Sequence, residues 1–347
     1  MSAETSTWLN TNTLIGFTAK RGNAWHYRAD DQGEESNHYV GAIPVEDVTR
    51  RLFDTVTVVS GSVESTVITA DGVTRFTDPS SQSLWRLETG HRFGTFKLGY
   101  KIHDYQEWLL KNVATLLDDD LAIGSAGLLR GGGLAWVQVE VPETIDTPEG
   151  VSFRPFLSAA TSLDGSLSST YQCGAQVIVC DNTLSAALGE RDATRVKIKH
   201  SRNSIGRIGE VRDALQLVHN VADAFTAQVA VLCATEVTDK AWSAFLEAHN
   251  ETSSTDKQGE LRTGRSATMA DTRRQQLTQL WTSDLRVSPW QHTAFGVVQA
   301  VNTFAHHLGT TRGASKAERN AERAVLGAAD ALDQSTLDTL QRVLASV

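Results

Sequence analysis

The sequence is poor in cysteine, and its few cysteines form no metal-binding or disulfide pattern. Cys173, Cys180 and Cys233 are the only three in 347 residues, and no two of them make a C-x-x-C pair. Zinc ribbons and disulfide-stapled secreted domains need paired or regularly spaced cysteines, so both classes are excluded. We therefore expect reduced thiols in a cytoplasmic protein.

Long apolar stretches are also missing. No run approaches the roughly 18 apolar residues of a membrane span, and the longest, such as QVAVLCA, have the length of a core element. The first residues, MSAETSTWLNTNT, are polar and place no positive charge ahead of an apolar block. That pattern differs from a secretory signal, and we expect no membrane partner.

Positive charge is scarce overall, because 32 Lys and Arg face 41 Asp and Glu and give a formal net charge of -9. This balance excludes a protein that is coated with positive charge for nucleic acid. The shortage is not uniform. Residues 191–212 contain seven Lys or Arg and two acids, so this window is +5 and the remainder is -14. A local basic surface is therefore compatible with the composition.

Motifs for the common cofactors are absent. The sequence has no G-x-x-x-x-G-K-[ST] phosphate loop and no H-E-x-x-H metal motif. The glycines of RGGGLAW run into a strand pattern and not into a helix, so they predict a tight turn and not a pyrophosphate site. His306 and His307 would point about 100° apart on a helix and cannot chelate one ion together. We expect no metal and no cofactor.

Isolated polar residues leave an enzymatic alternative open. Asp164 lies in TSLDGSLS between two β-rich runs, where Asp-Gly is the ordinary hairpin signal. Cys173 and Cys180 would point to opposite faces of one strand, and a nucleophilic Cys180 needs a histidine partner that the sequence does not identify. His200 follows the basic segment. Asp118 to Asp120 end a helical pattern, where a solvated helix end is the simpler interpretation.

The distribution of patterns predicts an α+β fold, with a mostly antiparallel sheet and packed helices in residues 1–205 and a helical region in residues 206–347. Hairpin turns are expected at Asp71-Gly72 and Asp164-Gly165. Short helices are expected in HDYQEWLLKNVATLLDD and NTLSAALGE. A polar segment without periodicity, about residues 251–266, predicts an exposed loop or linker.

The second half contains stronger helical signals. Apolar residues from Ile208 to Leu232 alternate steps of three and four and make one stripe along a helix of about 28 residues. Thr238 is suited to cap the following helix. A further helix is expected from Ser288 as N-cap, with Pro289 in its first turn, to a stop at Gly309. Two more helical stretches complete the chain.

The segment TRVKIKHSRNS is the clearest functional candidate. If RVKIK is a strand, Arg195, Lys197 and Lys199 share one face, while Val196 and Ile198 share the other. Cations about 6.6 to 7 Å apart match the spacing of phosphates in an extended single strand, which is on the order of 6 to 7 Å. A solvated strand face without a ligand is the alternative.

Further residues complete this candidate nucleic-acid site. Arg202 and Arg207 extend the basic segment, and Trp136 and Tyr171 are the aromatic residues that we expect to be exposed for stacking on bases. A second group of basic residues repeats at helical steps of four, three and four. Nearby glutamates partly neutralise it, so a solvated helix face explains it better. It consists of Arg312, Lys316, Arg319 and Arg323.

Several blocks together resemble a known family. NAWHY, IPVEDVTRRLF, GLLRGGGLAWVQVEVP, TSLDGSLS, VIVCDNTLSAAL and RVKIKHSRNS occur in the order seen in the uncharacterised phage/plasmid-like family that carries domain of unknown function 932. The resemblance covers about residues 23–250, and Cys-Asp-Asn-Thr-Leu is its most specific block. The acidic segment ADDQGEES departs from the pattern. The matching positions are Trp25-His26, Gly131 to Trp136, Ser162 to Ser166, Val179 to Leu184, and Lys197 to His200.

The resemblance implies a bacteriophage or plasmid origin and action in the cytoplasm of the bacterial host, but no known activity. Together with the basic segment, it favours a DNA-metabolism protein that binds single-stranded DNA, of the annealing or recombination type and without catalytic chemistry. The alternatives are an enzyme of unknown class that uses Asp164, Cys180 or His200, and a protein-binding effector that acts on a host factor.

The long apolar stripe also generates a prediction about assembly. The stripe from Ile208 to Leu232 needs a partner surface, either inside the chain or in another subunit. We expect a homo-oligomer. Light scattering at micromolar concentration, with and without DNA, should give a mass above that of one chain, and a monomer mass in both conditions contradicts the prediction.

Overall fold

The fold is described from a computed structural model. It covers residues 9–24, 27–115, 117, 121–141, 143–177, 182–184, 195–198, 209–309 and 328–347. For residues 21, 175–177, 182–184, 195–198, 209–219 and 328–330 it describes the backbone alone. Within these ranges no helix is long and apolar enough to cross a membrane.

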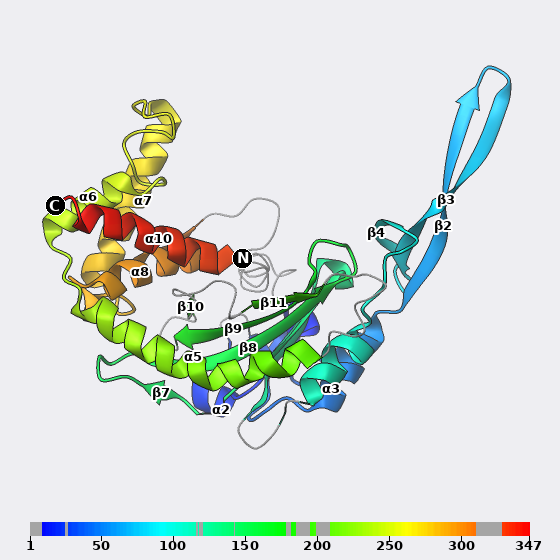
Figure 1. The fold of residues 1–347 in the computed structure, drawn as a ribbon, viewed down its shortest axis with the longest axis horizontal. Coiled ribbons are helices and arrows are strands. Elements are labelled where there is room, and N and C mark those ends of the chain that lie inside the picture. Colours follow the sequence, from blue (N-terminus) through cyan, green and yellow to red (C-terminus); the bar gives the residue numbers. More distant parts are fainter. Residues whose placement is uncertain are drawn as a thin grey trace. The chain divides into compact units, whose positions relative to one another are not determined.

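An antiparallel sheet occupies much of the N-terminal half (Figure 1). Its main path follows the order β1-β5-β6-β8-β9-β10, while β7 pairs with β8 and β11 pairs with β9. The α+β fold class is confirmed. The strands are β1 (Thr13–Ile15), β5 (Ala122–Leu129), β6 (Leu134–Glu140), β7 (Ile145–Asp146), β8 (Ser152–Ser162), β9 (Ser169–Val177), β10 (Asn182–Leu184) and β11 (Arg195–Ile198).

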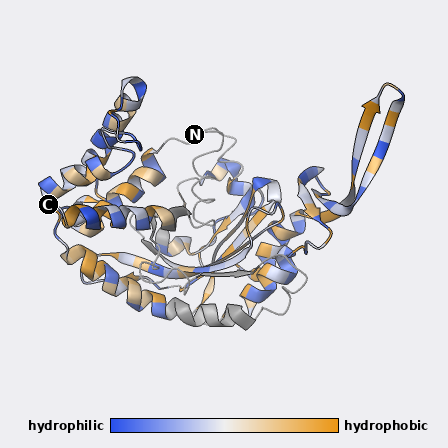
Figure 2. Ribbon diagram, turned by 45° about the horizontal axis from the view of Figure 1, so that its top comes forward, coloured by the Kyte–Doolittle hydropathy of each residue, from blue (hydrophilic) through white to orange (hydrophobic). Residues whose placement is uncertain are grey.

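A separate three-stranded sheet has the order β2-β3-β4, with β2 (Val58–Thr69), β3 (Gly72–Arg86) and β4 (His91–Lys97). The predicted turn at Asp71-Gly72 is confirmed, and Gly72 adopts a φ of 127° that favours glycine. Because β4 pairs only with residues 81–86 of β3, the far part of the hairpin is a ribbon of two strands (Figure 1). Figure 2 shows apolar positions along this ribbon.

The segment between the two sheets is helical, as predicted, but its first part is a π-helix, Tyr105–Leu110, which continues as α4 (Lys111–Ala114). Asp104 caps it by accepting hydrogen bonds from the backbone N–H groups of Gln106 and Glu107. Trp108, Leu109 and Val113 are buried, which agrees with the apolar period of the sequence. Asp118 to Asp120 lie outside the described residues.

Two compact units divide the chain, and they do not follow chain order. One comprises residues 1–142, 156–173 and 190–218, and the other comprises residues 143–155, 174–189 and 219–347. The boundary expected near residue 205 stays a prediction, because residues 199–208 lie outside the described residues. The first unit includes the helices α2 (Thr18–Arg21) and α3 (Val45–Arg51).

The predicted long helix is present as α5, Gly209–Ala234. In the second unit its buried residues Phe225 and Val229 pack in one cluster with Phe153 of β8, and the rings of Phe153 and Phe225 lie 4.5 Å apart. This part of the apolar stripe therefore finds its partner surface inside the chain. That contact weakens the argument from the stripe to an oligomer, which remains a prediction.

Four further helices surround a second apolar cluster, in which the stacked rings of Trp242 and Trp281 lie 4.5 Å apart. They are α6 (Asp239–Ala248), α7 (Gly264–Ser283), α8 (Ala294–Thr303) and α10 (Ala328–Leu344). The predicted cap is confirmed, because the Thr238 hydroxyl accepts a hydrogen bond from the backbone N–H of Ala241. A π-helix, Phe304–Leu308, extends α8 to the predicted stop at Gly309.

Two helix predictions are wrong in detail. Ser288 and Pro289 open a short 3-10 helix, Ser288–Trp290, and the left-handed φ of 65° at His292 separates it from α8. The capping residue of α8 is Thr293, whose hydroxyl accepts from the N–H of Gly296. The segment NTLSAALGE does not begin as a helix, because Asn182–Leu184 pairs with β9 as a strand.

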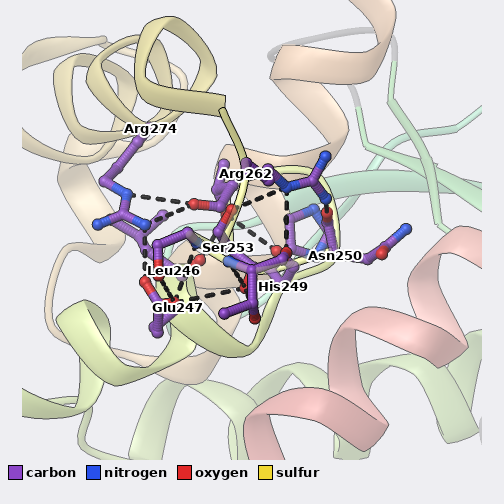
Figure 3. A network of polar contacts seen from close by, with 10 residues as sticks. Leu246, Glu247, His249, Asn250, Ser253, Arg262 and Arg274 are labelled. Atoms are coloured by element: carbon purple, nitrogen blue, oxygen red, sulfur yellow. Dashed lines mark hydrogen bonds and ion pairs between the residues drawn. The ribbon is translucent and has the colours of Figure 1, made fainter. Parts of the chain in front are cut away.

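Hydrogen bonds from arginine side chains hold the polar segment at about residues 251–266 in place, so it is an ordered loop and not a linker (Figure 3). The Arg262 guanidinium donates hydrogen bonds to the carbonyl oxygens of Ser253, Thr255 and Asn250 at 3.1, 3.0 and 2.6 Å. Arg274 donates to the carbonyl of Thr252, a fully buried residue, at 2.7 Å. The helix α7 already begins at Gly264, inside the predicted loop.

The hydrogen bonds of Arg262 to this loop generate a prediction about stability. Arg262→Ala removes one donor group that satisfies three backbone carbonyls, so the free energy of unfolding should fall by about 1 to 3 kcal/mol. Chemical denaturation measures this change. Arg265→Ala is the matched control, because Arg265 is exposed on the first turn of α7 and its removal should change stability by less than about 0.5 kcal/mol. Equal effects of the two substitutions contradict the prediction.

Candidate nucleic-acid interface

The basic segment forms a strand, as the sequence predicts. The backbone of β11, Arg195–Ile198, pairs antiparallel with β9, and the register places Arg195 opposite Gln172 and Lys197 opposite Thr170. Strand pairing therefore fixes the backbone of these cations. The directions of the side chains of Arg195 and Lys197 lie outside what the structure describes, so their shared face stays a prediction. Lys199, Arg202 and Arg207 lie outside the described residues altogether.

The two aromatic residues expected to stack on bases are buried, so that expectation of exposure is wrong. Trp136 is 7% exposed because its indole covers Gly127 on the neighbouring strand, where a Cβ would lie 2.1 Å from the ring. Its Nε1 donates to the Ser125 hydroxyl at 3.2 Å. Tyr171 is fully buried and packs against Trp108, with ring centroids 5.6 Å apart. Both rings fill the core, where a base cannot reach them.

The exposed indole lies on the three-stranded sheet instead. Trp85 of β3 is 37% exposed, whereas the other five tryptophans within the described ranges are at most 7% exposed. Its Nε1 donates to the Ser83 hydroxyl at 2.8 Å, and a Cβ added at Gly61 on the neighbouring strand would lie 3.8 Å from Nε1. The alternation in the sequence SLWR contains this signal, since Leu84 is fully buried and its neighbour Trp85 points the other way.

A cation lies across the strand pair from this indole. The ladder between β3 and β4 shifts between Leu84 and Trp85, so Leu84 pairs with Gly94 and Trp85 pairs with Arg92. The extra residue, Phe93, is buried. Arg92 is exposed, and its side chain makes no ion pair or hydrogen bond among the residues that the structure describes.

The neighbouring arginine has a structural role. Arg86 donates to the carbonyl oxygen of Gly131 at 2.8 Å and to that of Thr55 at 2.6 Å, and it pairs with Glu88 at 3.4 Å. The Tyr105 hydroxyl donates to the next carbonyl, that of Gly132, at 2.7 Å. These bonds attach β3 and the π-helix to the glycine turn between β5 and β6.

The glycine turn is confirmed as a tight turn. Arg130, Gly131 and Gly132 have φ values of 54°, 65° and 93°, a left-handed stretch that costs a non-glycine residue about 1 to 2 kcal/mol. Arg130 is held there by an ion pair with Asp164, at 3.1 Å between Nη1 and Oδ2. The N–H of Leu163 donates to the Gly133 carbonyl at 2.8 Å. The RGGG and SLDGS blocks are therefore neighbours in the fold.

Asp164 is engaged in fixing the two turns. Its carboxylate accepts hydrogen bonds from the backbone N–H and the hydroxyl of Ser166, at 2.9 and 2.5 Å. Burial raises the pKa of Asp164, but the hydrogen bonds from Ser166 and the Arg130 guanidinium outweigh it and hold that pKa below its ordinary value. A carboxylate held in this way is poorly suited to accept a proton during catalysis.

Of the other residues considered for an enzymatic role, the structure describes only Cys173. Burial raises the pKa of the Cys173 thiol to about 12, so that thiol stays protonated and unreactive near neutral pH. Cys180 and His200 lie outside the described residues. Within the described ranges, no group of three or more His, Cys, Asp or Glu could hold a metal ion.

Comparison with known proteins gives one match. The family model described as "Domain of unknown function (DUF932)" matches residues 93–326, about two thirds of the chain. The matched range includes the glycine turn, the Ser-Leu-Asp-Gly-Ser block and the basic strand. No curated protein and no solved structure matches significantly.

The Asp164 site generates a prediction about pH. A carboxyl group whose pKa is lower in the folded chain stabilises it above the unfolded pKa, and this contribution is lost as the pH falls through the folded pKa. Asp164→Asn should therefore lower the free energy of unfolding by about 1 kcal/mol at pH 7, and the difference should shrink below about pH 4. Urea denaturation at several pH values measures it. Asp71→Asn, in the exposed hairpin turn, is the control and should show no such pH dependence.

Proposed function

The chain belongs to the DUF932 family, and we propose that it binds single-stranded DNA as a DNA-metabolism protein of the annealing or recombination type. In this proposal the protein acts in the cytoplasm of a bacterial host on phage or plasmid DNA, and it supplies phosphate contacts and no catalytic chemistry.

The observation that carries the proposal is the strand at Arg195–Ile198 inside an acidic chain. The window of residues 191–212 has a charge of +5, and its centre is a strand hydrogen-bonded to β9. Alternate residues of a strand repeat at about 6.6 to 7 Å, which suits the phosphates of an extended single strand. The chain as a whole has a net charge of -9, so it should not be attracted to duplex DNA in general. A group of cations on one strand instead favours contact with a polyanion at that strand.

A protein-binding effector is the second candidate, and one observation favours it. The two-stranded part of the β2–β3 hairpin exposes apolar side chains, with Ile68 at 79%, Val73 at 64% and Phe76 at 58%. A two-stranded ribbon in water is marginally stable by itself, so contact with another protein would stabilise this part. Of the residues named for the enzymatic alternative, Asp164 is held in a turn by Ser166 and Arg130, while Cys180 and His200 lie outside the described residues.

The proposal predicts a steep dependence of DNA binding on salt. Affinity for single-stranded DNA should fall strongly between about 50 and 200 mM salt, because bound phosphates release counterions. Changing Arg195, Lys197 and Lys199 together to Gln should weaken binding by one to several kcal/mol and flatten the salt slope by roughly three units. Fluorescence anisotropy of a labelled oligonucleotide measures both quantities.

The control is a second triple substitution that removes the same charge from exposed positions of the other unit: Lys240→Gln, Lys257→Gln and Arg265→Gln. It should lower affinity much less and leave the slope close to that of the unchanged protein. Absence of binding at 50 mM salt, or equal effects of the two triple variants, would refute the proposal. Unfolding of the first triple variant would instead assign those cations a structural role.

A further inference from the structure

We propose that Trp85 and Arg92 form a nucleotide subsite on the outer face of the three-stranded sheet, in which the indole stacks on an unpaired base and the guanidinium contacts a phosphate of the same strand. This inference rests on the proposed binding of single-stranded DNA and deepens it, because it adds a base contact to the phosphate contacts expected of β11.

The indole is held in place before any ligand arrives. The hydrogen bond from Nε1 to the Ser83 hydroxyl, 2.8 Å long, fixes the ring in its plane. Gly61 lies on the neighbouring strand beside the indole, where an added Cβ would be 3.8 Å from Nε1, an ordinary contact distance. Ser83 itself is 6% exposed and donates to the Gly61 carbonyl at 3.2 Å. A ring fixed on one side and exposed on the other loses little conformational freedom when a base stacks on it.

Its exposure is costly without a ligand. Burying a large aromatic side chain stabilises a protein by roughly 25 cal/mol for each Å² removed from water, and the other described tryptophans are all buried to at least 93%. Trp85 alone among them keeps 37% of its surface in water. A base has a flat π-face of similar size, and base–aromatic stacking is the general device by which proteins bind single strands without regard to sequence.

The position of Arg92 suits a phosphate next to a stacked base. Directly opposed residues of an antiparallel pair share a face and have Cβ atoms about 4.5 to 5.5 Å apart, so the Arg92 side chain starts beside the indole. The buried bulge residue Phe93 sets this register, because without it the ladder would place a different residue opposite Trp85. Arg92 is exposed and has no acidic partner among the described residues.

The surrounding charge also favours an anion. Residues 81–97 contain three cations, Arg86, Arg92 and Lys97, against one acid, Glu88. The Glu88 carboxylate is already occupied, since it accepts from the backbone N–H of Thr57 at 2.8 Å and pairs with Arg86 at 3.4 Å. Arg92 is thus the exposed cation left without an acid beside it, because Arg86 is committed to the glycine turn and the charge of Lys97 acts on the Asp78 carboxylate.

The surroundings of Trp85 are mixed in polarity and include one exposed cation. Next to Trp85 lie Gly61, Ser83 and, opposite Ser83, Thr95, and the exposed apolar neighbours are Val59 at 36% and Leu87 at 63%. A protein hot spot is a cluster of anchors enclosed by contacts that exclude water, whereas a single platform with a cation beside it matches the pattern of single-strand binders.

The experiment compares two ligands, one with bases and one without, and two apolar substitutions of Trp85, one aromatic and one aliphatic. Binding of an oligothymidylate and of an abasic deoxyribose-phosphate strand of the same length is measured by competition against a labelled oligonucleotide. Trp85→Phe keeps an aromatic face, whereas Trp85→Leu keeps an apolar side chain at this position and removes the aromatic face. Leu87→Ala, two residues along and 63% exposed, is the matched control. Thermal unfolding verifies that each variant is folded.

We expect Trp85→Leu to weaken oligothymidylate binding about 5- to 100-fold, the effect of losing one base–aromatic stack, and to leave abasic binding unchanged. Trp85→Phe and Leu87→Ala should bind like the unchanged protein. Arg92→Gln should weaken both ligands and lower the salt slope by roughly one unit.

The outcomes separate the subsite from the proposed function. If the unchanged protein binds neither ligand, single-strand binding fails and the subsite fails with it. If the unchanged protein binds but Trp85→Leu does not weaken oligothymidylate binding, or weakens both ligands equally, the stacking platform is wrong and the phosphate contacts of β11 are unaffected.

Discussion

Three carbonyl oxygens of the glycine turn, those of Gly131, Gly132 and Gly133, connect separate parts of the first unit by hydrogen bonds. A chain that turns in this conformation cannot satisfy these carbonyls within its own ladder, and a buried unpaired carbonyl is costly. Arg86, Tyr105 and Leu163 each donate to one of them. The same three bonds therefore attach the three-stranded sheet, the π-helix and the β8–β9 connection to the end of the β5–β6 hairpin.

The position of Trp85 follows from this attachment. Arg86 points toward the turn, and because successive residues of a strand point to opposite faces, Trp85 points away from it. The register shift at Phe93 then brings Arg92 opposite the indole. The strain at Arg130, which the ion pair with Asp164 offsets, thus belongs to the framework that orients the proposed subsite. The depressed pKa of Asp164 agrees with a structural role for this ion pair.

The proposed binding surface combines two different kinds of contact. β11 would supply a row of cations for phosphates, and the outer face of β2-β3-β4 would supply one fixed aromatic ring and one cation. Such a division gives affinity without sequence preference, which suits a protein that anneals or protects single strands. The apolar ribbon of β2 and β3 is a different surface, and its exposed side chains are suited to a protein partner.

The sequence by itself determined the elements whose signals are local. The strand at Arg195–Ile198, the helix Gly209–Ala234, the cap at Thr238 and the turn at Asp71-Gly72 follow from periodicity, side-chain capping and the backbone freedom of glycine, and the structure confirms them. Only the tertiary structure decided which aromatic residues are exposed. Trp136, Tyr171 and Trp85 all lie on strands with similar alternation, but burial depends on what packs on each face. The Trp136 indole fills the space that a side chain at Gly127 would take inside the core, whereas the Trp85 indole lies at the surface. At the start of α8, which Thr293 caps, the Ala294 N–H donates to the Thr235 carbonyl, a partner distant in the sequence. The loop around Arg262 depends on bonds to carbonyls seven to twelve residues away, and no periodic pattern encodes either contact.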